Sequence, residues 1–175
     1  MWLNKKKKTG LTILFVGGAI LLAVILIYAF TNGQPKTTAT CQQVTTVLTD
    51  LGYVPSDTTS LYLEDDAQLK NSVAIENEQI RFDFFEFDNG NSAMNVYKHA
   101  CSQMLDYRNS GSISNSEGYA NYYMNSLKSN GVYYITIRVD NTAIYAYCDE
   151  DYMSELGKIL SGIGYYGDAN KDKYN

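Results

Sequence analysis

The sequence has little of what most catalytic sites require. Its only histidine is His99, and it contains no G-x-S-x-G serine motif, no H-E-x-x-H zinc motif, no P-loop and no C-x-x-C pair. Cys101 lies two positions beyond His99 in a predicted helix, where such side chains do not face each other, which excludes a nucleophile–base pair. Acid–base chemistry would rest on carboxylates alone, and the candidate pair, Asp83 with Glu86, is interpreted as solvated strand positions. We therefore expect no catalytic residue, no cofactor and no enzyme activity.

Cysteine is scarce as well. The three cysteines, Cys41, Cys101 and Cys148, cannot form a full disulfide framework, because at most one pair can close. All three fall on apolar faces of predicted elements, which is typical of small buried core residues. The alternative is one disulfide that joins Cys148 to Cys41 or to Cys101.

Acidic residues are absent before Asp50. Four of the 14 Lys and Arg residues occupy positions 5–8, which leaves 10 basic against 19 acidic residues from position 36 onward, a net charge of −9. Binding to nucleic acid depends on Lys and Arg side chains that neutralise phosphates. This charge balance excludes nucleic acid as a partner.

Charged residues are also missing from positions 11–30, an apolar run that begins at Leu11 and ends at Phe30. Twenty residues at about 1.5 Å each form a helix of about 30 Å, which matches the hydrocarbon thickness of a bilayer. Four lysines before such a run are typical of a cytoplasmic end. We predict an uncleaved transmembrane helix in the lipid bilayer. The chain would then be a single-pass cell-membrane protein with a cytoplasmic N-terminus and an extracytoplasmic C-terminal domain.

Two alternatives concern this apolar run. A cleaved signal peptide normally has a shorter apolar core, of about 7–15 residues, followed by small residues. The sequence around Gly10 resembles the processing site of type IV pilins, which implies an assembly subunit processed after Gly10. That family has glutamate at the fifth residue after the cut, where this chain has Phe15, and Pro35 should end the long pilin helix early.

The rest of the chain is long enough for one domain with a real core. Composition changes along the chain predict five parts: a basic cytoplasmic tail at 1–10, the transmembrane helix at 11–30, a stalk at 31–39, an α+β extracytoplasmic domain at 40–166 and a polar tail at 167–175.

Hydrophobic periodicity predicts an α+β domain, with three helices packed on one face of a mainly antiparallel sheet of four to five strands in the order α-β-β-α-β-β-β-α. Thr40 and Gln43 form a capping box that begins the first helix. The Ser- and Gly-rich stretch at 109–118 is interpreted as a flexible loop. The strands are expected at 73–75, 79–87, 119–128, 132–139 and 142–148. A two-residue loop at Asp140 and Asn141 would pair Val139 with Thr142 and fix the register of the last hairpin.

Some segments resemble known families. The strand at 82–87 with the Ala- and Tyr-containing helix after it, the stretch 138–142 and the closing Ile163-Gly164-Tyr165 resemble small anchored ectodomains of low-GC Gram-positive bacteria. The resemblance covers about half the chain and implies location and fold only.

The C-terminal tail has the D-x-N-x-D beginning of a calcium loop at Asp168, Asn170 and Asp172, and resembles the calcium loops of dockerins. The resemblance would make these three residues metal ligands. The sixth position is Lys173, not glycine, and no glutamate follows at the twelfth. We therefore expect a solvated tail and no metal site.

Tyrosine is in excess, with 16 Tyr against 6 Phe and 1 Trp. The hairpin register puts Tyr134 and Arg138 on the same outward sheet face as Tyr145 and Tyr147. One interpretation is cross-strand packing beneath a covering helix. The other is an exposed aromatic platform for a protein or a glycan. On the second interpretation the protein is a non-catalytic, membrane-anchored domain that binds a protein or an envelope polymer through these four residues.

Overall fold

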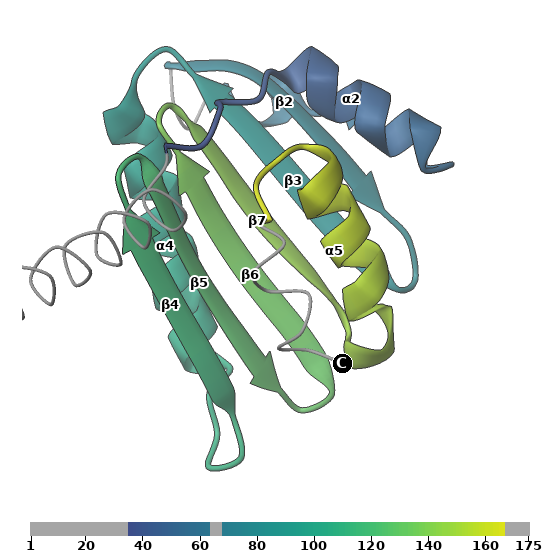
Figure 1. Cartoon of the computed structure of the whole chain (residues 1–175), viewed down its shortest axis with the longest axis vertical. Helices are drawn as coiled ribbons and strands as arrows, with labels where there is room; N and C mark the ends of the chain where they lie inside the picture. Colours follow the sequence, from purple (N-terminus) through teal and green to yellow (C-terminus); the bar gives the residue numbers. More distant parts are fainter. Residues whose placement is uncertain (1–34, 64–67, 167–175) are drawn as a thin grey trace, which may run out of the picture. The chain divides into compact units, whose positions relative to one another are not determined.

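The computed structural model describes residues 35–63 and 68–166 (Figure 1). They form an antiparallel sheet in the strand order β1-β2-β3-β7-β6-β5-β4. Helices α2 and α5 lie on one face of this sheet, and α4 lies on the other (Figure 1). The strands are β1 Ser56–Asp57, β2 Leu69–Glu76, β3 Ile80–Phe87, β4 Ile113–Tyr119, β5 Tyr122–Ser129, β6 Val132–Val139 and β7 Thr142–Asp149. The helices are α2 Cys41–Asp50, α3 Thr59–Tyr62, α4 Gly90–Asp106 and α5 Met153–Gly162, with a 3₁₀ turn, η1, at Glu150–Tyr152.

Strands β4 to β7 form a meander with three two-residue turns. Each turn contains a residue with left-handed backbone, Ala120 (φ 48°), Asn130 (φ 55°) or Asp140 (φ 47°), and in the middle turn Gly131 follows with φ 78°. Such turns match the twist of antiparallel strands. The register of β6 and β7 is the predicted one, with Val139 opposite Thr142.

The two faces of the sheet follow from the alternation of side chains along the strands, which a register shift in β2 between Leu69 and Asn71 interrupts. The face toward α2 and α5 carries the main core, because its side chains are apolar and almost completely buried. This core includes Phe82, Phe84, Met124, Ile135, Ile137 and Ile144 from the strands, Leu48 from α2, Leu156, Ile159 and Leu160 from α5, and Tyr165 after it. The face toward α4 carries Tyr134, Tyr145 and Tyr147 and, together with α4, the smaller cluster of Leu69, Phe87, Ala93 and Ala143, whereas Tyr133 belongs to the main core.

The first described residues are hydrogen-bonded to the body of the domain. Thr40 caps α2 through the predicted box with Gln43. The Ala39 amide donates to the hydroxyl of Tyr165, which lies 2.6 Å from the hydroxyl of Thr142. Residues 36–39 of the predicted stalk therefore lie against the sheet, and Lys36–Asn175 forms a compact unit by itself.

The predicted fold needs correction in its numbers of strands and helices and in the placement of the helices, which cover both faces of the sheet and not one. The described residues contain a seven-stranded sheet and four α-helices, where four to five strands and three helices were expected. The main omission is β4, which we interpreted as part of a flexible loop. Its side chains are mostly exposed and polar because it lies at the edge of the sheet. Such a strand lacks the apolar alternation on which strand prediction depends.

The membrane prediction also needs correction. Within residues 35–63 and 68–166, no helix combines the length and the apolar character needed to cross a bilayer. This finding contradicts the predicted fold class and localisation, since both included a membrane-spanning helix. The run at 11–30 on which they depended lies outside the described residues, as do Gly10 and the tail at 167–175 with Asp168, Asn170 and Asp172.

Candidate functional site

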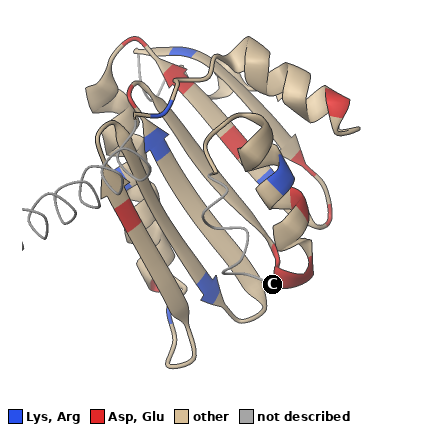
Figure 2. Ribbon diagram, viewed as in Figure 1, with Lys and Arg blue, Asp and Glu red and all other residues tan. Residues whose placement is uncertain are grey.

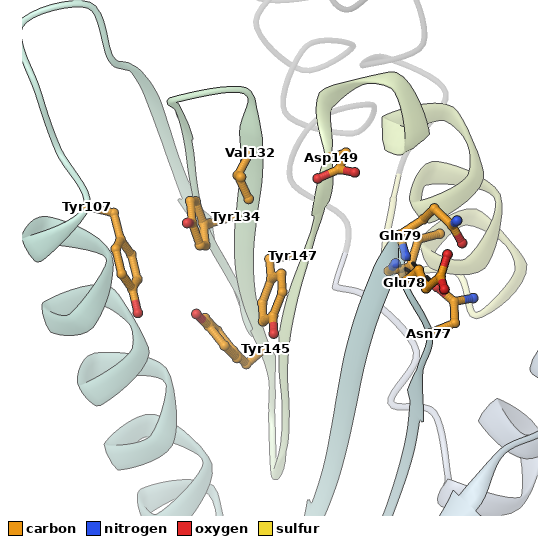
Figure 3. Close-up of a pocket in the computed structure, with 10 residues that line it drawn as sticks. Asn77, Glu78, Gln79, Tyr107, Val132, Tyr134, Tyr145, Tyr147 and Asp149 are labelled. Atoms are coloured by element: carbon orange, nitrogen blue, oxygen red, sulfur yellow. Dashed lines mark hydrogen bonds between the residues drawn. The ribbon is translucent and has the colours of Figure 1, made fainter.

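The structure brings three of the predicted binding residues together. Tyr134 of β6 and Tyr147 of β7 lie opposite each other, with ring centroids 6.0 Å apart, and the rings of Tyr145 and Tyr147 are 6.1 Å apart. Tyr107, just after α4, stacks on Tyr134 at 4.7 Å with an angle of 7° between the rings. Figure 3 shows these four side chains gathered between the helix and the strands. We call Tyr107, Tyr134, Tyr145 and Tyr147 the tyrosine cluster.

The tyrosine cluster is neither fully open nor fully covered. Tyr134, Tyr145 and Tyr147 are half-buried, and Tyr107 is exposed. Burial raises the pKa of Tyr145 to about 12, with smaller contributions from the other three tyrosines. Its hydroxyl therefore stays protonated near neutral pH and can donate a hydrogen bond.

Arg138 lies apart from the tyrosine cluster, although it shares their sheet face. Its guanidinium is 5.5 Å from the ring centroid of Tyr123. It packs so closely under the start of α4 that a Cβ added to Gly90 would be 2.8 Å from Arg138 Nη2. Arg138 therefore supports the first turn of α4, and it lies at the opposite end of the sheet face from Tyr134 and Tyr147.

A cleft of about 640 Å³ runs between α4 and strands β3 and β7. We call it the aromatic cleft, because aromatic rings form much of its wall. Its lining residues are Tyr62, Leu69, Arg81, Asp83, Phe85, Phe87, Val96, His99, Gln103, Tyr107, Tyr145 and Tyr147. A smaller pocket of about 320 Å³ shares Tyr107, Tyr145 and Tyr147 with the cleft and also contains Tyr134 (Figure 3). The tyrosine cluster thus lines two adjoining hollows.

Asp83 is the most unusual polar group in the aromatic cleft. Its side chain is 6 % exposed, and its Oδ2 accepts a hydrogen bond of 2.9 Å from Arg81 Nε. Its Oδ1 is buried and has no hydrogen-bond partner among the described residues. Burial raises the pKa of Asp83 above its ordinary value, and the hydrogen bond and charge of Arg81 oppose this. A buried carboxylate oxygen without a donor is costly, which makes this position a candidate for ligand contact.

Asp83 and Glu86 do not form the carboxylate pair that we considered from the sequence, and neither is a solvated position. Asp83 is 4 % and Glu86 7 % exposed. Asp83 faces α4, whereas Glu86 accepts a hydrogen bond of 3.0 Å from the Cys41 amide at the start of α2, on the opposite face. The sheet lies between the two carboxylates, so they cannot act on one substrate together.

All three cysteines are free. Cys148 belongs to the core beneath α2 and α5, while Cys101 lies on α4 beyond the sheet. Cys41 lies near Glu86 at one end of β3, whereas Cys148 pairs with Ile80 at the other end. Glu86 and Ile80 are six residues apart, which is about 20 Å along a strand at 3.3 Å per residue. Neither pairing considered for Cys148 fits this geometry, since a disulfide needs Cα atoms within about 7 Å.

The described residues show no metal cluster, and Figure 2 shows how their charged residues are distributed. No group of three His, Cys, Asp or Glu side chains within 35–63 and 68–166 is arranged to hold a metal ion. Seen from the side of α2 and α5, the basic residues are scattered among acidic ones without forming a continuous patch (Figure 2).

Comparison with known proteins adds little to these observations. No protein-family model and no curated protein matches the chain. Among solved structures, the chain is similar to the crystal structure of a GTP binding regulator from Thermotoga maritima. The TM-score is 0.44 and the sequence identity 14 %, with 77 % of this chain and 95 % of that chain covered. A likeness at this level carries no argument about function.

Proposed function

We propose that this protein is a non-catalytic binding protein, which holds a partner molecule in the aromatic cleft. The observation that carries the proposal is that three members of the tyrosine cluster, Tyr107, Tyr145 and Tyr147, line both hollows on the α4 face. Helix α4 covers only the middle of this face, and the strands beside it keep half-buried tyrosine rings in contact with solvent. Tyrosine offers a large, rigid contact surface with a polar tip, which suits recognition.

The size and lining of the aromatic cleft support this proposal. Ligand pockets generally measure about 300–1,000 Å³ and combine apolar walls with a few placed polar groups. The cleft is about 640 Å³, with polar groups from Arg81 and Asp83 on β3 and from His99 and Gln103 on α4. Its lining includes no Ser, Thr, Cys or Lys side chain, so the residue types that could act as nucleophiles are limited to Asp83, His99 and the tyrosines.

Site-specific photocrosslinking in the cells that produce the protein would test the proposal. A photoreactive benzoylphenylalanine at position 107 or 147 would stand inside the aromatic cleft. At position 123 it would serve as the control, because Tyr123 lies on the same sheet face but packs against Tyr97 and Arg138 and lines neither hollow.

We expect discrete adducts from positions 107 and 147 and none from position 123. The adducts should disappear when Tyr145, between the two probes, is replaced by leucine. No adduct from either cleft position, or equal labelling at position 123, would refute the proposal.

A further inference from the structure

Asp83 indicates what kind of ligand the aromatic cleft is built to hold. Its side chain lines the cleft, is 6 % exposed, and presents an Oδ1 atom that lacks a hydrogen-bond partner among the described residues. A ligand that donates a hydrogen bond to this oxygen would satisfy it. The missing partner is therefore a donor.

The ion pairs around Asp83 bear on whether this donor is charged. Arg81 is shared between two carboxylates, with Nε 2.9 Å from Asp83 Oδ2 and Nη1 3.3 Å from Glu76 Oε1. The Glu76 side chain is 64 % exposed and lines neither hollow, so within the cleft the charges of Arg81 and Asp83 balance. An ammonium donor would attract the Asp83 carboxylate by its charge as well as by its hydrogen bond to Oδ1, whereas a neutral hydroxyl would offer the hydrogen bond alone.

The walls of the aromatic cleft suit an organic cation. Phe85, Tyr107, Tyr145 and Tyr147 line it together with Asp83. The faces of aromatic rings carry negative potential and attract ammonium groups within about 6 Å. The same rings can pack against an aliphatic chain, so that a cation on an apolar stem would use both parts of the wall.

We propose that the aromatic cleft binds a primary ammonium group on an aliphatic stem, with Asp83 Oδ1 accepting one of its N–H groups and the tyrosine rings enclosing the stem. This inference rests on the proposed binding function and adds the chemical class of the ligand. The ammonium group belongs either to a free aliphatic amine or to a lysine side chain of a partner polypeptide.

Titration of the full-length protein with n-pentylammonium chloride, followed by NMR of isotope-labelled tyrosine rings, tests this ligand class. The matched neutral probe is 1-pentanol, which has the same stem and a hydroxyl donor without charge. We expect saturable shifts of the Tyr145 and Tyr147 resonances with the ammonium and none with the alcohol at equal concentration. Equal binding of both probes, or no binding of the ammonium, would overturn the inference.

The variant Asp83→Asn keeps an acceptor oxygen at this position but removes the charge. It should weaken binding of n-pentylammonium by about tenfold or more, as expected for loss of a charge-assisted hydrogen bond. Asp106→Asn is the control, because Asp106 is exposed at the end of α4 and lines neither hollow. Unchanged binding in Asp83→Asn would contradict the inference.

A second variant keeps the test decisive if Asp83→Asn disturbs folding. Tyr147→Leu should weaken ammonium binding about three- to tenfold through loss of the cation–π contact. Tyr123→Leu, on the same face but outside the cleft, should leave binding unchanged, and equal effects of the two changes would count against the inference.

Two further comparisons identify where the ammonium group comes from and show which of the two proposals fails. A peptide with one central lysine that binds more tightly than n-pentylammonium identifies a lysine side chain, and the reverse order identifies a free amine; both support the ligand class. If photocrosslinks form at positions 107 and 147 while n-pentylammonium fails to bind, the ligand class is wrong and the binding function stands. If both experiments fail, both proposals fall.

Discussion

Glu86 shows how one side chain can join two parts of this fold. Its carboxylate accepts hydrogen bonds from the Cys41 amide, at 3.0 Å, and from Lys70 Nζ, at 3.1 Å. Burial disfavours its charged form, but these donors and Asn71 outweigh that effect and hold the pKa of Glu86 below its ordinary value. The negative charge at the first residue of α2 also suits the positive end of the helix dipole. Glu86 thus fixes the start of α2 to β3.

The lowered pKa of Glu86 predicts a loss of stability in acid. A carboxylate with a lower pKa in the folded state stabilises the protein above its unfolded pKa, and this contribution disappears as pH falls through the folded pKa. We expect the free energy of unfolding, measured by urea titration, to fall as pH drops below about 5 and through the lowered pKa of Glu86.

The variant Glu86→Gln isolates this contribution. It should be less stable at pH 7 by about 1–3 kcal/mol and should lose less stability in acid than the parent protein. Glu78→Gln, at an exposed position between β2 and β3, is the control and should behave like the parent. An identical acid slope in Glu86→Gln would show that other carboxylates govern the transition.

At the scale of elements, the strands could be predicted where the turn between them has a recognisable sequence. The Asp140–Asn141 loop and the alternation around it predicted the pairing of β6 with β7, and the capping box predicted the start of α2. The turn between β4 and β5 went unnoticed, because Ala120 is not a typical turn residue although its φ is 48°. Without that turn, one strand was predicted at 119–128, and most of β4 was left in the predicted loop at 109–118.

The candidate site was predictable only in part, because alternation within a strand says nothing about which other elements pack against it. Alternation along β6 and β7 placed Tyr134, Tyr145 and Tyr147 on one face, as the structure has them. It could not show that α4 lies over this face or that Asp83 lines the same cleft, because these are contacts between elements distant in sequence. The sequence did hold one signal for this cleft: Arg81, Asp83 and Phe85 alternate along β3 and therefore share one face of the sheet.

Two glycines in different elements give a matched pair of stability predictions. Gly131 has φ 78° in the β5–β6 turn, whereas Gly157 lies in α5, and a Cβ added at either position would meet no atom within 4 Å. Gly131→Ala should destabilise by about 1 kcal/mol through backbone strain. Gly157→Ala should stabilise by up to about 1 kcal/mol, since alanine is the better helix former.

Thermal and urea unfolding of both glycine variants would measure these changes. Neither added methyl group gains or loses packing contacts. Opposite changes in the free energy of unfolding would therefore reflect the backbone conformation at the two positions alone. Changes of the same sign would show that the turn or the helix adopts another conformation.

At the scale of the whole molecule, the sheet has a protected centre and two different edges. Strands β3, β7 and β6 are each paired on both sides, while β4 and the two-residue β1 form the edges. Helices α2 and α5 cover one face and α4 the other (Figure 1). Backbone amides in the centre are therefore shielded by neighbouring strands and by helices.

This arrangement predicts a gradient of amide hydrogen exchange across the sheet. Exchange in β3, β7 and β6 should require global unfolding, whereas β4 should open locally. Mass spectrometry of peptides from these strands should find exchange in β4 at least about a hundredfold faster than in β6. Equal protection of β4 and β6 would indicate that something covers the β4 edge in solution.

The strand order also has a consequence for how the protein folds. Strands β4 to β7 pair with their neighbours in sequence, whereas β3 must find β7 across a long stretch of chain, as in the pair Ile80–Cys148. Pairings that close long loops form late, because their entropy cost comes before their contacts. Since Arg81, Asp83 and Phe85 come from β3 and Tyr145 and Tyr147 from β7, the aromatic cleft should come into existence only in the last step of folding.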